Sequence, residues 1–249
     1  MSTPDWLTAT PIAHRGLHDR ANGIVENTIS AAEAAVARGF AIECDVQLTA
    51  DGDAVVFHDF TLDRLTRETG AVAERTSAAL SETAVEGAVS DRIPTLTAFL
   101  DCIAARVPLV IEIKSRFGGD MRLADRTCEI LRFYRGPFCV KSFDPAVVAR
   151  VRAVAPGILR GIVSESQHDA PGYAHLSREQ RHALANLLHF EESRPQFLSW
   201  NVKHLPAGPP YLARLLGRLP LMAWTVRNAE DRARSQSFAD QMVFEGFLP

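Results

Sequence analysis

Residues 108–114 read Pro-Leu-Val-Ile-Glu-Ile-Lys, a pattern typical of a core strand. It is an apolar run that carries only two charged side chains, Glu112 and Lys114. Because side chains alternate between the two faces of a strand, these two residues point to one face together. Similar apolar runs recur along the chain, separated by longer amphipathic stretches. That alternation is typical of βα units around a parallel sheet.

The number of these units predicts the architecture. Eight runs are expected to form strands, at residues 11–14, 40–47, 108–114, 138–142, 158–163, 197–200, 220–226 and 241–245. Helical patterns lie between them near residues 28–38, 95–106, 121–134, 144–154, 176–190, 208–218 and 229–238. Over 249 residues, such a series predicts a (β/α)8 TIM barrel rather than an open doubly wound α/β sheet. No glycine-rich nucleotide-binding motif follows the first strand.

One segment departs from the βα rhythm. The second strand is followed by an Asp51-Gly52 turn, a second extended run at 54–58, and a polar stretch at 59–92. A connection this long inside a compact domain is usually functional or forms a small subdomain. We therefore expect a single barrel domain over residues 1–249, with an insertion at about 59–92 that covers the barrel mouth.

Composition and charge narrow the classes of function. Hydrophobic residues make up 47% of the chain and the formal net charge is -3, with no long run of Lys or Arg, so nucleic acid is not an expected partner. Four widely spaced cysteines without a CxxC pair predict buried thiols. The first residues lack a signal-peptide pattern, and no apolar run approaches the length of a membrane span. We expect a cytoplasmic protein without stable membrane insertion, and its oligomeric state stays open.

Acidic side chains converge on one face of the predicted strands. Glu43 and Asp45 stand two residues apart and point together, while Ile42 points the other way. An isolated pair of this kind is most often a solvated or salt-bridged strand face. Glu112, however, places a third carboxylate in the same core. Because crowded, buried carboxylates raise one another's pKa, a divalent cation would resolve the conflict, and oxygen ligands favour Mg²⁺ or Ca²⁺.

Two histidines and an arginine stand where strands give way to loops. His14 and Arg15 follow the first strand, and His58 ends the extra extended run. Barrel enzymes place their catalytic residues at such strand ends. A lone histidine is more often a packed or surface residue, but two beside a carboxylate cluster predict proton transfer, since imidazole ordinarily titrates near pH 6.5. Arg15 offers a fork of donors suited to phosphate oxygens.

Other polar residues carry weaker signals. Lys141 ends the strand at 138–142 and is a candidate phosphate ligand. No serine stands in a nucleophile-elbow context, which argues against a serine hydrolase. Five further histidines lie in polar loops or helices and are expected to be packing or surface residues rather than catalytic ones: His18, His168, His182, His189 and His204.

Six short motifs occur in an order and at a spacing that resemble the glycerophosphodiester phosphodiesterase family. They are His14-Arg15-Gly16, Glu26-Asn27-Thr28, Glu43-x-Asp45, Asp51-Gly52, His58-Asp59 and Glu112-x-Lys114. Two later segments agree with family motifs, namely Ser142-Phe143-Asp144 and Ala223-Trp224-Thr225-Val226. The resemblance spans nearly the whole chain, and its specific part lies in the first 115 residues.

The resemblance implies a metal-dependent enzyme that hydrolyses a small-molecule glycerophosphodiester to an alcohol and glycerol 3-phosphate. Glu43, Asp45 and Glu112 would bind the divalent metal ion, Mg²⁺ or Ca²⁺. His14 and His58 would act as general base and general acid. In the mechanism proposed for the family, the glycerol 2-hydroxyl attacks phosphorus to form a cyclic phosphate, which water then opens.

The same resemblance assigns residues to the substrate. Arg15 and Lys114 would hold the phosphate, and Trp224 would wall the glycerol pocket. Glu26 and Asn27 would orient the groups around the metal or sit near it. These roles follow from the motifs that the chain shares with the family.

Three positions depart from the family's pattern. Val25 stands in place of a proline, Arg227 in place of an asparagine, and Phe244-Glu245-Gly246 in place of Thr-Asp. None removes a metal ligand or a catalytic histidine, so we expect the last two to affect the leaving group rather than the chemistry. Two other functions stay open: a lysophospholipase D-like phosphodiesterase, and a catalytically inactive barrel that binds a phosphodiester.

Overall fold

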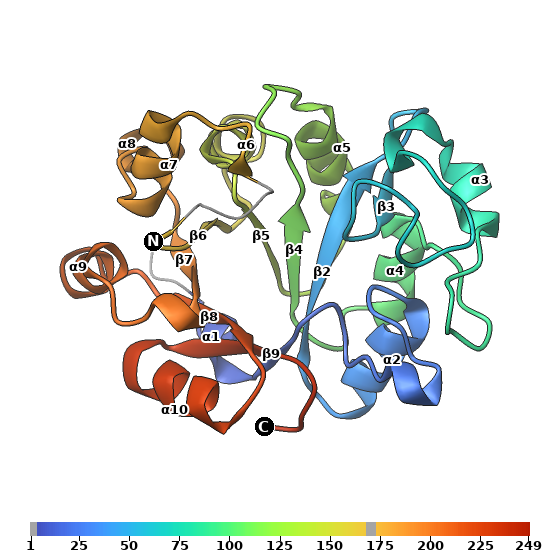
Figure 1. The fold of residues 1–249 in the computed structure, drawn as a ribbon, viewed down its shortest axis with the longest axis horizontal. Coiled ribbons are helices and arrows are strands. Elements are labelled where there is room, and N and C mark those ends of the chain that lie inside the picture. Colours follow the sequence, from blue (N-terminus) through green and yellow to red (C-terminus); the bar gives the residue numbers. More distant parts are fainter. Residues whose placement is uncertain (1–3, 168–172) are drawn as a thin grey trace.

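Eight parallel strands form a closed barrel in the computed structural model, which describes residues 4–167 and 173–249 (Figure 1). The first strand pairs with both the second and the last, which closes the ring. The predicted TIM barrel is therefore confirmed. Its strands are β1 (Ile12–Ala13), β2 (Ala41–Leu48), β4 (Leu109–Ile113), β5 (Phe138–Ser142), β6 (Arg160–Ser164), β7 (Phe197–Asn201), β8 (Leu221–Val226) and β9 (Gln241–Phe244).

Helices surround the barrel, as Figure 1 shows. They are α2 (Ile29–Ala37), α4 (Leu96–Ile103), α5 (Arg122–Leu131), α6 (Pro145–Val154), α7 (Arg178–Ala185), α8 (Phe190–Ser193), α9 (Gly208–Gly217) and α10 (Ala229–Phe238). Side-chain caps begin several of them; the Thr28 hydroxyl, for example, accepts a hydrogen bond from the Ala31 amide. The helix predicted at 176–190 is two helices, because Leu187 adopts a left-handed conformation (φ 56°) that interrupts it.

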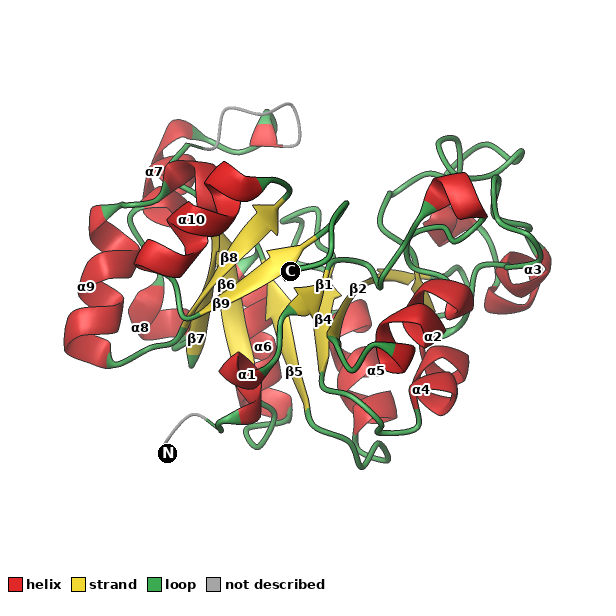
Figure 2. Ribbon diagram, turned by 90° about the horizontal axis from the view of Figure 1, so that it is seen from below, coloured by secondary structure: helices red, strands yellow, loops and turns green. Residues whose placement is uncertain are grey.

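Apolar side chains fill the barrel interior at its amino-terminal end. Ile12, Val110, Phe197 and Met222 are buried there in one cluster, each from a different strand. The short helix α1 (Trp6–Ala9) contributes Leu7 to the same cluster and lies below the strands in Figure 2. The interior is therefore closed at one end, and the polar groups lie toward the other, where the strands end.

The predicted alternation along β2 is confirmed. Ile42 and Val46 are fully buried in the core between the barrel and its helices, together with Ala32 of α2 and Phe99 of α4. Because side chains alternate, Glu43 and its neighbour two residues on must face the inside of the barrel. The apolar face of β2 thus packs against the surrounding helices, and its acidic face places carboxylates inside the barrel.

The segment between β2 and α4 contains β3 (Ala54–Val56), η2 (Val72–Glu74) and α3 (Ser77–Glu82). β3 pairs antiparallel with β2 outside the ring. A separate apolar cluster holds the segment, and it includes Phe57, Leu65 and Val85. Figure 1 places most of this insertion beside the barrel, on the side of β2.

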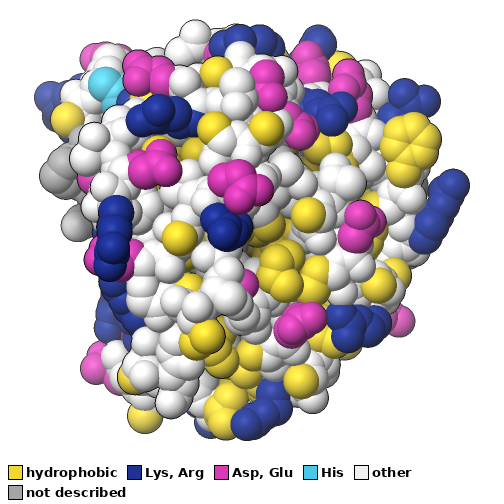
Figure 3. Space-filling view, turned by 90° about the vertical axis from the view of Figure 1, so that its right-hand side faces the viewer, with side chains coloured by type: hydrophobic (Ala, Val, Ile, Leu, Met, Phe, Trp, Pro, Cys, Tyr) yellow, Lys and Arg dark blue, Asp and Glu magenta, His cyan; other side chains and the backbone are white. Residues whose placement is uncertain are grey.

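The outer surface on the insertion's side carries charges of both signs. Figure 3 shows Lys and Arg interspersed with Asp and Glu over this face, with small apolar areas between them. Within the described parts of the chain, no helix has the length and apolar character needed to cross a membrane.

Candidate active site

The register of three neighbouring strands brings charged residues to one level inside the barrel. Asp45 of β2 pairs with Glu112 of β4, and Glu112 pairs with Lys141 of β5. All three side chains point inward near the strands' carboxyl ends, where barrel enzymes carry their chemistry. Two carboxylates and an ammonium group therefore face one another in a buried space.

Three carboxylates form a cluster that fits a metal ion. Glu43, Asp45 and Glu112 each offer one oxygen, and these atoms lie within 4.8 Å of one another. All three residues are buried. Oε1 of Glu43 is buried and accepts no hydrogen bond from the described residues, although Nζ of Lys141 lies 3.0 Å away. An oxygen-only set with such an atom suits a hard divalent cation.

Two lysines stand among these carboxylates. Nζ of Lys114 lies 2.7 Å from Asp45 Oδ1 and 2.5 Å from Glu112 Oε1. Nζ of Lys141 lies 3.5 Å from Glu112 Oε2. Burial alone would raise the pKa of the Asp45 and Glu112 carboxyls, but the neighbouring positive charges, Lys114 foremost, hold both pKa values below their usual range. The carboxylates therefore remain ionised and able to bind a cation.

The loop after β1 turns sharply to place Arg15. Gly16 has φ 81°, and a Cβ there would lie 2.8 Å from Ala31, so only glycine fits without displacing the helix. Arg15 itself adopts a left-handed conformation (φ 56°). Its amide donates to Glu43 Oε2 at 3.1 Å, and its Nε lies 3.4 Å from Asp45 Oδ2. The strained turn thus fixes a guanidinium group beside the metal-ligand candidates.

Asn27 and Glu26 support this turn from the start of α2. Nδ2 of Asn27 donates to Asp45 Oδ2 at 2.9 Å, and the Asp45 amide donates to Asn27 Oδ1 at 3.2 Å. Nη1 of Arg15 donates to Glu26 Oε1 at 2.6 Å. Burial would raise the pKa of Glu26, but the hydrogen bond from Arg64 and the charges of both arginines lower it to about 2.

A carboxylate directly after the last strand holds His14. Nδ1 of His14 forms a short hydrogen bond with Glu245 Oε2, and its Nε2 lies 3.9 Å from Glu43 Oε2. Burial would raise the pKa of Glu245, but the hydrogen bonds from His14 and His18 hold it well below its usual range. An ionised carboxylate can only accept a hydrogen bond, so Nδ1 of His14 is the donor. Nε2 of a neutral His14 is then an acceptor that faces the cluster. His18 also lies beside this carboxylate, with Nε2 3.7 Å from Glu245 Oε2.

His58 is held in the same manner by the residue that follows it. Nδ1 of His58 and Oδ1 of Asp59 are 2.6 Å apart. Burial would raise the pKa of Asp59, but the hydrogen bonds from His58 and Arg64 lower it strongly. The ionised carboxylate again accepts a hydrogen bond from Nδ1. Nε2 is then the ring nitrogen of His58 that is available to the pocket.

A pocket of about 160 Å³ connects these groups to solvent. Trp224 and Phe143 form its apolar wall, with ring centroids 5.4 Å apart and nearly perpendicular planes. Nε1 of Trp224 donates to the Ser199 carbonyl at 3.0 Å, which fixes the indole ring. The pocket's polar lining comprises His14, Arg15, Asp45, His58, Glu112, Lys114, Lys141, Thr225 and Arg227.

The structure thus brings all the predicted site residues together. Those that do not line the pocket are Glu26, Asn27 and Glu43, and each contacts a residue that does. Sequence reasoning missed Glu245, the main partner of His14. The sequence predicts that the departure at Glu245 affects the leaving group rather than the chemistry, and the structure adds a direct contact with a candidate catalytic residue, His14. A carboxylate at the end of a barrel strand was the available signal.

The sequence indicates no functional role for two further residues near the site, Arg64 and His18. Arg64 bonds both Glu26 and Asp59, and nothing local in the sequence indicates these distant partners. His18 was expected to be a packing or surface residue, yet it shares Glu245 with His14. His204 also has an acidic neighbour, with Nδ1 3.6 Å from Glu165 Oε2. His168 lies outside the described residues.

Comparisons with known proteins agree with this geometry. A relative from Bacillus subtilis (strain 168), YhdW, which is named for glycerophosphodiester phosphodiesterase activity, is 30% identical over 91% of this chain and 89% of its own. The glycerophosphodiester phosphodiesterase of Caldanaerobacter subterraneus subsp. tengcongensis is 34% identical over 61% of this chain and 65% of its own.

Solved structures share the fold. A phosphodiesterase of Oleispira antarctica in complex with the product sn-glycerol-3-phosphate superposes with a TM-score of 0.75, at 21% identity over 96% of this chain and 93% of its own. The model of the glycerophosphoryl diester phosphodiesterase family matches residues 14–246, from the first catalytic candidate to just beyond the last strand. The chain therefore belongs to the glycerophosphoryl diester phosphodiesterase family, a family of phosphoric diester hydrolases.

Proposed function

We propose that this protein hydrolyses glycerophosphodiesters to an alcohol and glycerol 3-phosphate, with a divalent metal ion and two histidines. The observation that carries the proposal is the convergence of three buried carboxylates with His14 and His58, each of which is bonded to its own carboxylate. Membership in the family supports the reaction class, and the product bound to the Oleispira antarctica structure supports the substrate class.

The carboxylates of Glu43, Asp45 and Glu112 would hold the metal ion. When bound, Mg²⁺ or Ca²⁺ would act as a Lewis acid toward phosphoryl oxygens and would lower the pKa of a nearby hydroxyl. The cluster's geometry and its oxygen donors support this assignment, and they suit either ion.

The phosphate would be bound by the cationic side chains around the cluster. Lys114, Lys141 and Arg15 balance the charge of the three carboxylates. Binding of a divalent ion would therefore give the site a net positive charge. Such a surplus favours an anionic phosphodiester, and it would stabilise the further negative charge that develops at phosphorus. Trp224 would pack against the glycerol carbons.

Proton transfer would pass through the two free Nε2 atoms. Nε2 of His14 would remove the proton of the glycerol 2-hydroxyl as its oxygen attacks phosphorus, and Nε2 of His58 would give a proton to the departing alcohol oxygen. The products of this step are the free alcohol and a cyclic glycerol phosphate. In the second step water adds to phosphorus and the ring bond between phosphorus and the 2-oxygen breaks, which gives glycerol 3-phosphate. His58 would take a proton from the water and His14 would give its proton to the 2-oxygen, so both histidines return to their starting protonation states.

The direct test is release of glycerol 3-phosphate from glycerophosphocholine, assayed before and after EDTA treatment and after Mg²⁺ or Ca²⁺ is restored. We expect activity that is lost with EDTA and recovered with metal. A protein that binds glycerophosphocholine but never cleaves it would instead be an inactive binding barrel. Faster turnover of lysophosphatidylcholine than of glycerophosphocholine would favour the lysophospholipase D-like function. A cytoplasmic location stays a prediction from the sequence.

A further inference from the structure

Arg64 lies in the insertion and contacts two carboxylates from separate parts of the site. Its Nε and Nη2 donate to Oδ2 and Oδ1 of Asp59, at 2.5 and 3.0 Å. Its Nη1 and Nη2 donate to Oε2 and Oε1 of Glu26, at 3.1 and 2.7 Å. The planar guanidinium thus meets two carboxylates at once, a geometry that a lysine ammonium cannot reproduce.

These contacts complete a series of hydrogen bonds that links two residues of the pocket lining, His58 and Arg15. At one end Asp59 accepts from Nδ1 of His58, and at the other Glu26 accepts from Nη1 of Arg15. Arg15 belongs to the rigid turn after β1. The position of the His58 imidazole is therefore tied, through Asp59 and Arg64, to the part of the site that faces the phosphate.

Apolar packing beneath these hydrogen-bonded residues fixes the positions of their main chains. Each of the residues Glu26, His58 and Arg64 has a buried apolar neighbour in the sequence. These neighbours are Val25, Phe57 and Leu65, and they belong to the apolar cluster of the insertion. Val25 is also the position that departs from the family's proline. The cluster fixes the main chains, but two facing carboxylates would repel each other unless a cation lay between their ends.

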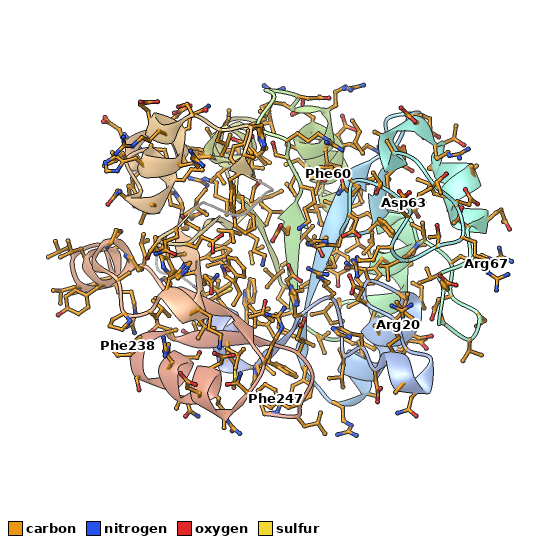
Figure 4. The ribbon with its side chains drawn as sticks, viewed as in Figure 1. Arg20, Phe60, Asp63, Arg67, Phe238 and Phe247 are labelled. Atoms are coloured by element: carbon orange, nitrogen blue, oxygen red, sulfur yellow. The ribbon has the colours of Figure 1, made fainter. Side chains whose placement is uncertain are left out.

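Arg64 makes these contacts while 44% of its side chain is exposed. Solvent-exposed ion pairs contribute little to folding stability. Its main effect should therefore be on the geometry of the acid and base groups rather than on the fold. Figure 4 shows that Arg67, three residues on, lies at the outer edge of the same segment and points away from the barrel. Arg67 forms no ion pair within the described part of the chain, which makes it a matched control.

We propose that Arg64 is a positioning residue for His58: by holding Asp59 against Glu26, it fixes the orientation in which His58 protonates the departing alcohol. This inference rests on the proposed function, because it needs His58 to act as the general acid. It has a consequence that a merely structural role lacks. Losing the orientation of a proton donor should slow the departure of an aliphatic alcohol, whereas p-nitrophenolate leaves without a proton.

The test compares Arg64→Ala, Arg64→Lys and Arg67→Ala on glycerophosphocholine and on the p-nitrophenyl ester of glycerol 3-phosphate. For Arg64→Ala we expect kcat to fall about 10- to 100-fold on glycerophosphocholine and less than about threefold on the p-nitrophenyl ester, with KM changed less than kcat. Arg64→Lys should be intermediate, because one ammonium cannot bond both carboxylates. Arg67→Ala should match the wild type on both substrates.

A double-mutant cycle of Arg64→Ala and Asp59→Asn supplies a second measurement, in variants that keep the local packing. Arg64→Ala should add little loss on glycerophosphocholine when Asp59 is already Asn, since the link to His58 is then broken. Equal losses on both substrates, or fully additive losses in the cycle, would overturn the inference while leaving the proposed function intact. A wild-type protein that cleaves neither substrate would overturn both.

Discussion

Nε of Arg227 lies 2.5 Å from Oε1 of Glu245, so two of the three residues that depart from the family's pattern form an ion pair with each other. The other oxygen of Glu245 accepts the hydrogen bond from His14. Arg227 is 56% exposed at the rim of the pocket, whereas Glu245 is mostly buried. The two departures therefore act as one unit, which reaches from the solvent to the candidate general base.

This unit can be tested by separating its two members. Glu245→Gln replaces an acceptor that fixes the His14 proton on Nδ1 with an amide that can also donate, so we expect kcat to fall by about 10²-fold or more. Arg227→Asn removes the outer partner only and should reduce kcat less than about fivefold. Steady-state kinetics of both variants on glycerophosphocholine decides the point. Near wild-type turnover of Glu245→Gln would show that His14 needs no carboxylate.

The metal site predicts a clear result for Glu43→Gln. The amide keeps the shape of the side chain but removes one of the charges that would neutralise the ion, so metal affinity should fall severely, by roughly 100-fold. Equilibrium dialysis against Mg²⁺ or Ca²⁺ measures this directly, without reference to activity. Unfolding curves of the metal-free proteins serve as the control for folding. Unchanged metal affinity in this variant would exclude Glu43 as a ligand.

Substitution of either pocket histidine should lower activity without a comparable loss of folding stability. His14→Ala and His58→Ala should each lower kcat by roughly 10²–10⁴-fold, because general acid or base catalysis contributes about that much. His182→Ala is a suitable comparison, since His182 lies exposed on α7 away from the pocket. Its kcat should stay within about twofold of the wild type. If either pocket variant did the same, that histidine would have no part in proton transfer.

The lowered pKa of Glu26 predicts how the folding stability depends on pH. Its pKa is lowered from 4.5 to about 2 in the folded state, so the ionised side chain stabilises the fold above about pH 4.5, and that contribution is lost as pH falls toward 2. Glu26→Gln should therefore reduce the free energy of unfolding at pH 7, by about 1 kcal/mol, because Arg64, which lowers this pKa most, is itself partly exposed and screened by solvent. Urea unfolding between pH 7 and pH 3.5 measures the difference from wild type. It should shrink below about pH 4.5, and a difference independent of pH would contradict the pKa.

The sequence alone determined the barrel and the inner charged residues, because both depend on local rules. Strand alternation sends Glu43 and Asp45 to one face whatever the neighbouring strands do, and a parallel sheet gathers strand ends at one edge. The ranges predicted for β5 and α10 agree with the structure to the residue. The helix expected at 176–190 was wrong because the left-handed conformation of Leu187 is not visible as a break in periodicity.

The partners of His14, His58 and Arg15 became known only from the folded structure. Glu245 and His14 are 231 positions apart in the chain, and they meet because β9 closes the ring against β1. Arg64 and Glu26 are 38 positions apart and meet because the insertion packs beside the barrel on its own apolar cluster. Periodicity within a segment carries no information about the distance between segments, so these contacts follow from barrel closure and from packing of the insertion.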